Sequence, residues 1–383
     1  MNILEEIQNC YVEWKELGEV VDTVASPVKL TKKEYQVSGK IPIVDQGEQF
    51  IAGYSDYEKY LKKDNYIIFG DHSERVKYVD FAFVQGADGL KIMKPKSGIK
   101  AKYIYYCFCN FYKKEGSYKR HWSKARTTLI PIPQSEEIQE KIVQILDKFT
   151  DYVTELTSEL TSRKNQYSYY RDKLLSFEDE VYQVEWKTLG EVATVTKLAG
   201  YEFTKYVNYS STGEIIALRG LNVKNGRLVL DDVKYIDNSE FSKLNRSKLQ
   251  IGDMLFTYVG TVGEVALIDK DDTYYLAPNV AMVRLNTNTI IAKYLMYYCQ
   301  SNGFVYNQIE RLMEASSMKN LTMEKIRKFK IPVPSLEIQS RIVQVLDNFD
   351  MVCNDLNIGL PKEIELRQKQ YEYWRDRLLD FSK

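Results

Sequence analysis

Apolar residues recur at alternating intervals of four and three in two stretches of the chain, which is the spacing of a helical seam. The first seam runs through Ile142, Leu146, Phe149, Val153, Leu156, Leu160, Tyr167, Tyr170 and Leu174, with Arg163 filling the one gap. The second runs through Ile342, Leu346, Phe349, Cys353, Leu356, Leu360, Ile364, Tyr371, Trp374 and Leu378. Each pattern predicts a long amphipathic helix. Two matching seams on one chain are expected to pack on each other as an antiparallel coiled coil.

The second seam contains an irregularity. Two intervals of four residues adjoin from Leu356 through Leu360 to Ile364, which inserts four residues into the heptad pattern. Gly359 and Pro361 lie at this point. We therefore expect the second helix to be kinked or broken there.

The segments ahead of the two seams are predicted to mix α and β structure, because short apolar runs alternate with Gly and polar turn residues. Matched strands are expected at Asn65–Phe69 and Asp253–Val259, and at Gly89–Met93 and Val280–Leu285. Matched helices are expected to begin at Ala101 and Ala292. The loops between these elements differ in length and sequence. Such divergence is typical of one scaffold that presents two different binding surfaces.

These matches belong to an internal repeat of about 200 residues. Val12–Lys15 returns as Val184–Lys187, Ile130–Pro133 as Ile331–Pro334, and Glu137–Phe149 as Glu337–Phe349. Each copy is long enough to be a domain with a helical appendage. The expected division is a globular domain over residues 1–134, a helical spacer over 135–183, a second globular domain over 184–334 and a second spacer over 335–383.

The repeat also predicts symmetry. Leu4–Trp14 echoes Phe177–Trp186, so Met1–Glu13 should lie in one half where Phe177–Glu185 lies in the other. The two copies would then be related by a rotation near two-fold, and the N- and C-termini would be neighbours.

Composition narrows the classes of function. Net charge is zero, yet residues 12–133 carry 21 Lys and Arg against 15 Asp and Glu, and residues 186–334 carry 19 against 15. The helical segments are acidic, with 6 against 12 in residues 134–185 and 7 against 9 in residues 335–383. Basic globular domains are compatible with a polyanionic ligand. The absence of a membrane-length apolar run and of a signal-peptide pattern favours a cytoplasmic protein without membrane contact.

Several kinds of chemistry find no support in the sequence. There is no phosphate-binding loop, no dinucleotide fingerprint, and no Asn-Pro-Pro or Asp-Pro-Pro tetrad that would hold a flipped base. His72 and His121 are the only histidines, and the five cysteines form no CxxC pair, so neither a His-based catalytic cluster nor a zinc site is expected. The chain is therefore predicted to be non-catalytic.

Three groups of residues carry a family resemblance. The first is the pair of Ile-Pro-x-Pro blocks with their following helices. The second comprises Gly252–Phe256, Val259–Gly263, Phe69–His72 and Gly86–Gly89. The third is the tandem of Thr154–Thr157 and Ser158–Thr161, two tetrapeptides of about one helical turn each. Together these resemble the specificity subunit of type I restriction–modification systems, across essentially the whole chain.

The resemblance implies an α+β protein with two target-recognition domains in a pseudo-two-fold repeat, separated by long helices. It implies a subunit that reads a split, asymmetric double-stranded DNA site and docks two methyltransferase subunits and the restriction/translocase subunits. It implies no cofactor in this chain, with S-adenosylmethionine, ATP and Mg on the partner subunits. Two alternatives are a self-contained DNA methyltransferase or nuclease, and a coiled-coil scaffold that does not bind DNA.

Polar and cationic side chains on loops or helix ends are the candidates for DNA contact. In the first domain they are His72, Ser73, Arg75, Lys77 and Gln85, with a basic cluster of Lys119, Arg120, Lys124 and Arg126 near Tyr118, His121 and Trp122. In the second domain they are Arg219, Asn222, Lys224, Tyr258, Thr261 and Asn279, with Ser316, Ser317 and Lys319 as a later loop. The basic cluster is predicted to bind phosphates, because cations neutralise the backbone without reading sequence.

Overall fold

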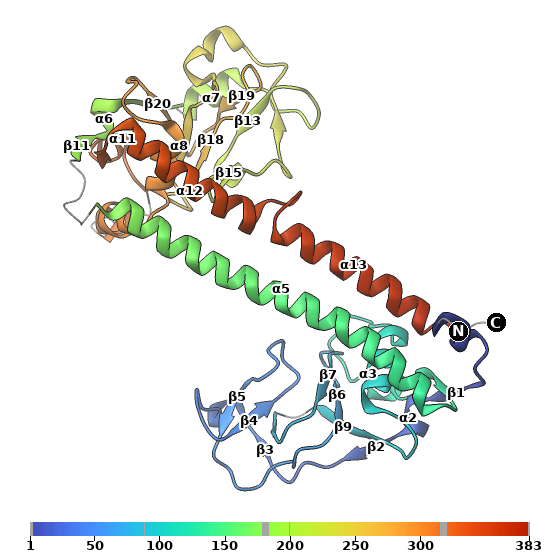
Figure 1. Cartoon of the computed structure of the whole chain (residues 1–383). Coiled ribbons are helices and arrows are strands. Elements are labelled where there is room, and N and C mark those ends of the chain that lie inside the picture. The colour runs from blue at the N-terminus through green and yellow to red at the C-terminus, as the bar shows by residue number, and fades with distance from the viewer. Residues whose placement is uncertain (1–2, 88, 178–183, 199, 315–319, 382–383) are drawn as a thin grey trace. The chain divides into compact units, whose positions relative to one another are not determined.

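The computed structural model describes residues 3–87, 89–177, 184–198, 200–314 and 320–381. It divides into two compact units (Figure 1). Unit 1 consists of Met1–Thr157 with Glu363–Lys383, and unit 2 of Ser158–Lys362. The chain passes between them twice, within helix α5 (Glu136–Ser176) and within helix α13 (Leu360–Leu378). The four-part division expected from the sequence stays an interpretation, because each unit combines a globular part with pieces of the helical segments.

Unit 1 is built on a four-stranded sheet of order β2-β9-β6-β7 and a second of order β3-β8-β4-β5, with β1 and β10 paired separately. Its strands are β1 (Val12–Glu16), β2 (Val21–Val24), β3 (Lys29–Leu30), β4 (Ile41–Val44), β5 (Gly53–Ser55), β6 (Tyr66–Gly70), β7 (Val76–Val79), β8 (Val84–Gly86), β9 (Leu90–Pro95) and β10 (Leu129–Pro133). Its helices are α1 (Ile3–Gln8), α2 (Leu17–Val20), η1 (Lys32–Glu34), α3 (Ala101–Phe111) and α4 (Trp122–Ala125), besides its parts of α5 and α13.

Unit 2 repeats this plan with a four-stranded sheet of order β12-β20-β17-β18 and a separate pair β11-β21, and it adds the sheets β16-β13-β19 and β14-β15. Its strands are β11 (Glu185–Thr188), β12 (Ala193–Lys197), β13 (Ile216–Leu218), β14 (Val223–Lys224), β15 (Arg227–Leu228), β16 (Lys234–Tyr235), β17 (Met254–Thr257), β18 (Val265–Leu267), β19 (Tyr274–Leu276), β20 (Val280–Leu285) and β21 (Lys330–Val333). Its helices are α6 (Leu189–Val192), α7 (Gly200–Tyr206), η2 (Gly220–Asn222), η3 (Phe241–Lys243), η4 (Asn245–Ser247), α8 (Ala292–Cys299), α9 (Asn302–Phe304), the π-helix η5 (Val305–Glu310), α10 (Arg311–Glu314), α11 (Met323–Arg327) and α12 (Leu336–Asn354).

The four predicted strands and the two predicted helices are confirmed. They are β6 and β17, β9 and β20, and α3 and α8, at corresponding places in the two sheets. β6 is buried at every position, as a central strand covered on both faces should be. The Ile-Pro-x-Pro segments form β10 and β21, each in a two-stranded pair, where proline's missing N–H disturbs no continuous ladder.

The helical seams are confirmed, and so is the break in the second helix. α5 is one helix of 41 residues, whereas α12 ends at Asn354 and α13 begins at Leu360. The chain folds tightly over the end of α12 at Gly359, where an added Cβ would lie 2.5 Å from the carbonyl oxygen of Met351. Only glycine fits this approach without a shift. Proline then suits the first turn of α13, where a backbone N–H has no helical partner.

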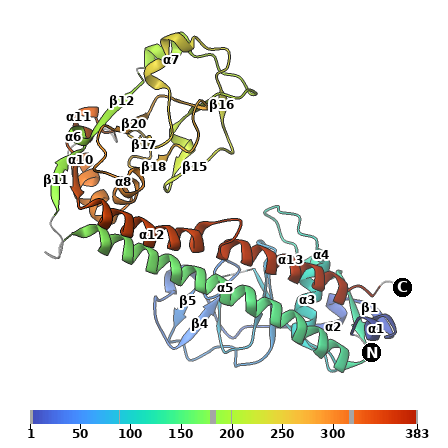
Figure 2. The same cartoon turned by 45° about the horizontal axis from the view of Figure 1, so that its top comes forward.

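Each unit contains an antiparallel pair of helices (Figures 1 and 2). In unit 2, the ring of Tyr170 on α5 stacks on that of Phe349 on α12 with centroids 5.6 Å apart. In unit 1, Trp374 and Leu378 of α13 share an apolar core with Ile142 of α5. The packing of the two seams on each other, as the sequence predicted, is therefore observed within both units.

The two termini are neighbours, as predicted. Ile7 of α1 and Leu378 and Leu379 at the end of α13 are buried in the same apolar core of unit 1. The ion pair from Lys141 to Glu6, at 2.8 Å, ties α1 to α5. The matching segment of the other copy, Phe177–Glu185, lies mostly outside the described residues.

A repeated glutamine joins each long helix to its domain. Gln339, fully buried, accepts a hydrogen bond from the N–H of Ile291 at 2.9 Å and donates to the carbonyl oxygens of Thr289 and Pro334. Gln139 does the same in unit 1, accepting from the N–H of Lys100 at 2.9 Å. Each glutamine thus satisfies a backbone N–H at the start of α3 or α8.

A repeated aspartate completes this connection. Asp147 accepts hydrogen bonds from the Tyr106 hydroxyl at 2.6 Å and from Lys102 Nζ at 2.7 Å. Asp347 binds the hydroxyl of Tyr297 and the ammonium of Lys293 at 2.6 and 2.8 Å. The Glu-Ile-Gln and Leu-Asp-x-Phe blocks of the sequence are therefore structural, because their polar members hold α5 and α12 against α3 and α8.

Candidate nucleic-acid interface

The hairpin turn after β6 in unit 1 and the one after β17 in unit 2 make matching backbone hydrogen bonds. The N–H of Asp71 donates to the carbonyl oxygen of Gly89 at 2.6 Å, and that of Tyr258 donates to Asn279 at 3.2 Å. Gly89 and Asn279 both have positive φ, of 88° and 72°. Glycine and asparagine are the residues that tolerate this conformation best.

A long loop approaches each turn from the other side. The carbonyl oxygen of Asp71 accepts a hydrogen bond from the N–H of His121 at 2.9 Å, and that of Tyr258 accepts one from Leu321 at 3.0 Å. Each turn is thereby held between the residue ahead of β9 or β20 and the end of the loop that leads to α4 or α11. The scaffold that positions the candidate residues is thus repeated.

Two carboxylates of the unit 1 turn fasten its loop. Asp71 Oδ1 accepts from the N–H groups of His121 and Trp122 at 2.9 and 2.7 Å. Glu74 accepts from the Tyr112 hydroxyl at 2.6 Å and from the N–H of Gly116 at 2.8 Å. Burial alone would raise the pKa of Glu74, but these hydrogen bonds outweigh it and lower the pKa below its usual value.

This arrangement brings together two groups of candidates that lie far apart in the sequence. His72 of the turn stacks on Tyr118 of the loop, with ring centroids 5.3 Å apart and planes 23° from parallel. Ser73 and Arg75 are half-buried on the same turn, and Lys119, Arg120 and Lys124 are exposed on and just after the loop. Lys119 and Lys124 both pair with Glu115, at 2.5 and 2.8 Å, which lowers the pKa of that carboxyl to about 2.

Contrary to the expectation from the sequence, Lys77 and Gln85 are buried. Lys77 is buried and donates from Nζ to the carbonyl oxygens of Asp45 and Gln49 at 2.8 and 2.6 Å. Gln85 is 3% exposed and donates to the carbonyl oxygen of Ala87 at 3.2 Å. Lys77 thus holds the loop after β4 and Gln85 the turn that follows its own strand β8, so neither belongs to the proposed DNA-binding set.

In unit 2, Asn222 is also internal. It is fully buried, accepts from the N–H of Arg219 at 3.1 Å and donates to the carbonyl oxygens of Val229 and Asp232, each at 2.8 Å. Arg219 is partly exposed and donates to the carbonyl oxygen of Asp232 at 2.8 Å. Asn222 therefore shapes the turn that carries Arg219, and it does not face solvent.

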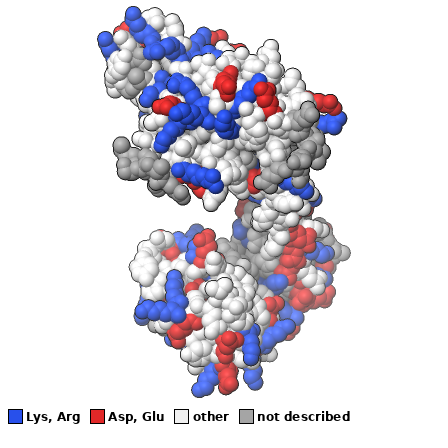
Figure 3. Space-filling view, turned by 90° about the vertical axis from the view of Figure 1, so that its left-hand side faces the viewer, with Lys and Arg blue, Asp and Glu red and all other residues white. Residues whose placement is uncertain are grey.

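The other candidates of unit 2 are accessible in part. Lys224, Thr261 and Asn279 are exposed, and Tyr258 is half-buried with the Lys197 ammonium 5.9 Å from its ring centroid. Ser316, Ser317 and Lys319 lie outside the described residues. On the face drawn in Figure 3, Lys and Arg side chains gather over unit 2.

Two further cations, Lys325 and Arg327, were not predicted from the sequence, although the repeat points to them. Lys124 lies in α4 and Arg126 is the residue after that helix. They correspond to Lys325 and Arg327 of α11. Lys124 donates to the carbonyl oxygen of Lys113 in the preceding loop at 3.4 Å, and Lys325 donates to that of Leu312 in α10 at 3.2 Å. Arg126 and Arg327 pack against Gly18 and Gly190, and both are exposed. Aligning the two copies residue by residue gives this match.

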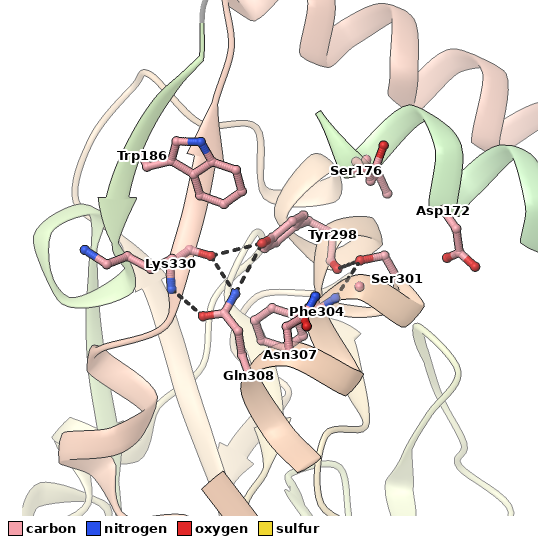
Figure 4. Close-up of a pocket in the computed structure, with 11 residues that line it drawn as sticks. Asp172, Ser176, Trp186, Tyr298, Ser301, Phe304, Asn307, Gln308 and Lys330 are labelled. Atoms are coloured by element: carbon pink, nitrogen blue, oxygen red, sulfur yellow. Dashed lines mark hydrogen bonds between the residues drawn. The ribbon is translucent and has the colours of Figure 1, made fainter. Parts of the chain in front are cut away.

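Unit 2 also has a pocket of about 570 Å³ between the end of α5, β11 and the helices after α8 (Figure 4). Gln308 of the π-helix spans its floor, donating to the Tyr298 hydroxyl at 3.2 Å and to the Lys330 carbonyl oxygen at 2.9 Å. The N–H of Lys330 donates back to Gln308 Oε1 at 2.6 Å. Trp186 on β11 lines the pocket and is 49% exposed.

Within the described ranges, no group of three or more His, Cys, Asp or Glu side chains could hold a metal ion. None of the helices described there is long and apolar enough to cross a membrane. The five cysteines are free thiols, three of them buried.

The sequence and fold match one family. The profile of the type I restriction modification DNA specificity domain matches residues 11–163 and 183–366, which is most of the chain and both copies of the repeat. The chain therefore belongs to the family of type I restriction–modification DNA specificity subunits. Its role is that of the DNA-recognition subunit, and the resemblance drawn from the repeated motifs is confirmed.

Individual relatives agree with this assignment. The chain is 34% identical to a type I restriction enzyme specificity subunit of Escherichia coli over 100% of this chain and 98% of that one. It is 28% identical to a putative type I restriction enzyme specificity subunit of Haemophilus influenzae over 98% and 97%. The crystal structure of a type I restriction–modification S subunit from M. genitalium has a TM-score of 0.62 at 14% identity, covering 98% of both chains. This last likeness shows the common fold.

Proposed function

We propose that the chain reads a split, asymmetric duplex site, one half with each unit. The observation that carries this proposal is the repeated turn and loop on one scaffold. The backbone hydrogen bonds of Asp71 match those of Tyr258, while the side chains that the two turns present differ. Two different surfaces on one scaffold would read two different half-sites, as opposed to one palindrome.

The unit 1 surface would combine His72, Ser73 and Arg75 with Tyr118, Lys119, Arg120, Lys124 and Arg126. The unit 2 surface would combine Arg219, Lys224, Tyr258, Thr261 and Asn279 with Lys325 and Arg327. Lys and Arg at repeated positions suit phosphates, which every duplex offers, and the side chains that differ between the units suit base edges.

Catalysis would belong to partner subunits that bring S-adenosylmethionine, ATP and Mg. Two identical methyltransferase subunits need two equivalent sites, and the repeat offers them. Trp14 on β1 and Trp186 on β11 occupy the same position in the two copies and are 45% and 49% exposed. Tyr373 and Tyr169 are likewise matched and exposed, at 53% and 60%. Exposed aromatics kept in both copies are suitable anchors for a protein partner.

Methylation-site mapping in a host that carries this chain and its partners tests the proposal. A split motif with an unspecified gap is expected, and substitutions in one unit should alter one half only. A continuous motif, or changes in both halves from one unit, would contradict it. DNA methylation or cleavage by the purified chain alone would favour a self-contained enzyme. A gel shift without binding to any duplex of a degenerate library would favour a non-DNA scaffold.

A further inference from the structure

The loop Tyr112–His121 of unit 1 combines a fixed base with an exposed tip. Tyr118 at the tip is 90% exposed, although the loop is held at both ends by buried carboxylates. Asp71 and Glu74, which are 5% and 3% exposed, direct their oxygens to the loop and come from a single turn. Glu74 itself has a φ of 52°, a conformation that non-glycine residues rarely adopt.

The ring beneath Tyr118 is also placed by specific contacts. The N–H of His72 donates to Gln46 Oε1 at 3.2 Å, and the ring lies against Gly89, where an added Cβ would be 3.0 Å from its Cδ2 atom. His72 Nδ1 is buried and finds no hydrogen-bond partner among the described residues. The stacked pair is thus held in place by its neighbours, and the Nδ1 atom of its histidine makes no hydrogen bond within the described residues.

In the part of the chain that the structure describes, unit 2 has no loop held in this way by two carboxylates of the hairpin turn. Its turn presents Tyr258 where unit 1 has Asp71, and α9, η5 and α10 occupy the region after α8. The loop Tyr112–His121, with the carboxylates that hold it, is therefore one of the differences between the two units. If each unit reads one half-site, this loop contributes to reading one half-site and not the other.

We propose that Tyr118 and His72 determine the sequence read at one half-site, and that Asp71 and Glu74 are positioning residues that hold the loop ready for DNA. This inference rests on the proposed DNA-reading function. A loop fixed before binding loses little conformational entropy when it enters a groove. Tyr118 offers a ring face for apolar contact and a hydroxyl for a base edge, while exposed Arg120 beside it attracts phosphates.

The test is a binding selection from a random duplex library with the full chain, purified with any partner subunits with which it assembles. Tyr118→Ala is expected to reduce enrichment at one or two base positions of one half-site by at least about 10-fold, as expected for one lost base contact, and to leave the other half-site unchanged. Tyr11→Ala is the control, because Tyr11 is also an exposed tyrosine of unit 1, at 62%, but lies outside the loop. It should reproduce the wild-type selection.

Glu74→Gln tests the positioning role. It should loosen the same base positions and speed hydrogen exchange at the N–H groups of Glu115 and Gly116, whereas Tyr118→Ala should leave that exchange slow. Unchanged selection by Tyr118→Ala, or equal weakening at all sequences, would overturn the inference. A wild-type chain that selects no sequence at all would instead refute the proposed function.

Discussion

The two units share a scaffold and differ in how they present the residues on it. In unit 1 the turn after β6 carries two carboxylates that fasten a ten-residue loop from Tyr112 to His121. In unit 2 the N–H and the carbonyl oxygen of Tyr258 bind the backbone of Asn279 and Leu321, and the short helices α9, η5 and α10 follow α8 where unit 1 has this loop. The lesson is that the repeated residues preserve the connection of helix to domain, and the differing residues alter the surface offered to a ligand.

The largest expected effect tests the shared part of this comparison. Gln339→Ala should lower the free energy of unfolding by about 2–4 kcal/mol, because it removes three hydrogen bonds of a fully buried side chain and leaves the buried carbonyl oxygen of Pro334 without this partner. Gln139→Ala should cost a similar amount in unit 1. Chemical denaturation monitored by hydrogen exchange in each unit measures both losses. A loss confined to one variant would show that the two connections are not equivalent.

A smaller effect is expected where the units differ. Asn222→Ala should destabilise unit 2 by about 1–3 kcal/mol, because the turn before β14 loses three hydrogen bonds of a fully buried side chain. Hydrogen exchange in unit 1 should not change. Lys224→Ala, at an exposed position nearby, serves as the matched control and should leave stability within about 0.5 kcal/mol. If Asn222→Ala altered base preference while unit 2 remained fully stable, the side chain would be a reading residue after all.

The outcome for Asn222 also shows how far the sequence could be used. Periodicity and repetition sufficed for the strands β6 and β17, the helices α3 and α8, the seams and the break near Gly359, because these follow from spacing and backbone restrictions. Burial of individual polar residues did not follow. Lys77 and Asn222 have the residue types that read DNA, yet each satisfies backbone groups of a neighbouring turn. Only the tertiary contacts separate these two roles.

The meeting of His72 with Tyr118 was equally beyond the sequence. Forty-five residues separate them in a segment of strands and a helix, and the contact depends on Asp71 and Glu74 binding the far loop. Lys325 and Arg327, by contrast, could have been found from the sequence. Their match to Lys124 and Arg126 needs only an alignment of the two copies.

These matched cations give a prediction about both units. Replacing Lys124 and Arg126 with Ala should weaken binding to specific and random duplexes alike, and so should replacing Lys325 and Arg327. Each lost phosphate contact should reduce the slope of log affinity against log salt concentration by about one. Titrations at several salt concentrations measure this slope. A pair that relaxed preference at one half-site while leaving the slope unchanged would read bases.

The smallest expected change concerns the connection between the units. The unit boundary falls between Thr157 and Ser158, which is the junction of the two tetrapeptides within α5. A third Thr-Glu-Leu-Thr unit after Thr161 would lengthen this helix by about 6 Å, and four residues rotate the seam little because they make about one turn. In the other chain segment that joins the units, the non-helical residues between Asn354 and Leu360 lie just ahead of the passage, and they would have to extend because no matching insertion is made there. We therefore expect both half-sites to keep their sequences while the unspecified gap grows by about one or two base pairs, at about 3.4 Å each. Methylome sequencing of the insertion variant measures the gap and both half-sites together. An unchanged gap would show that α5 does not set the spacing, and an altered half-site would show that the helix contributes to reading.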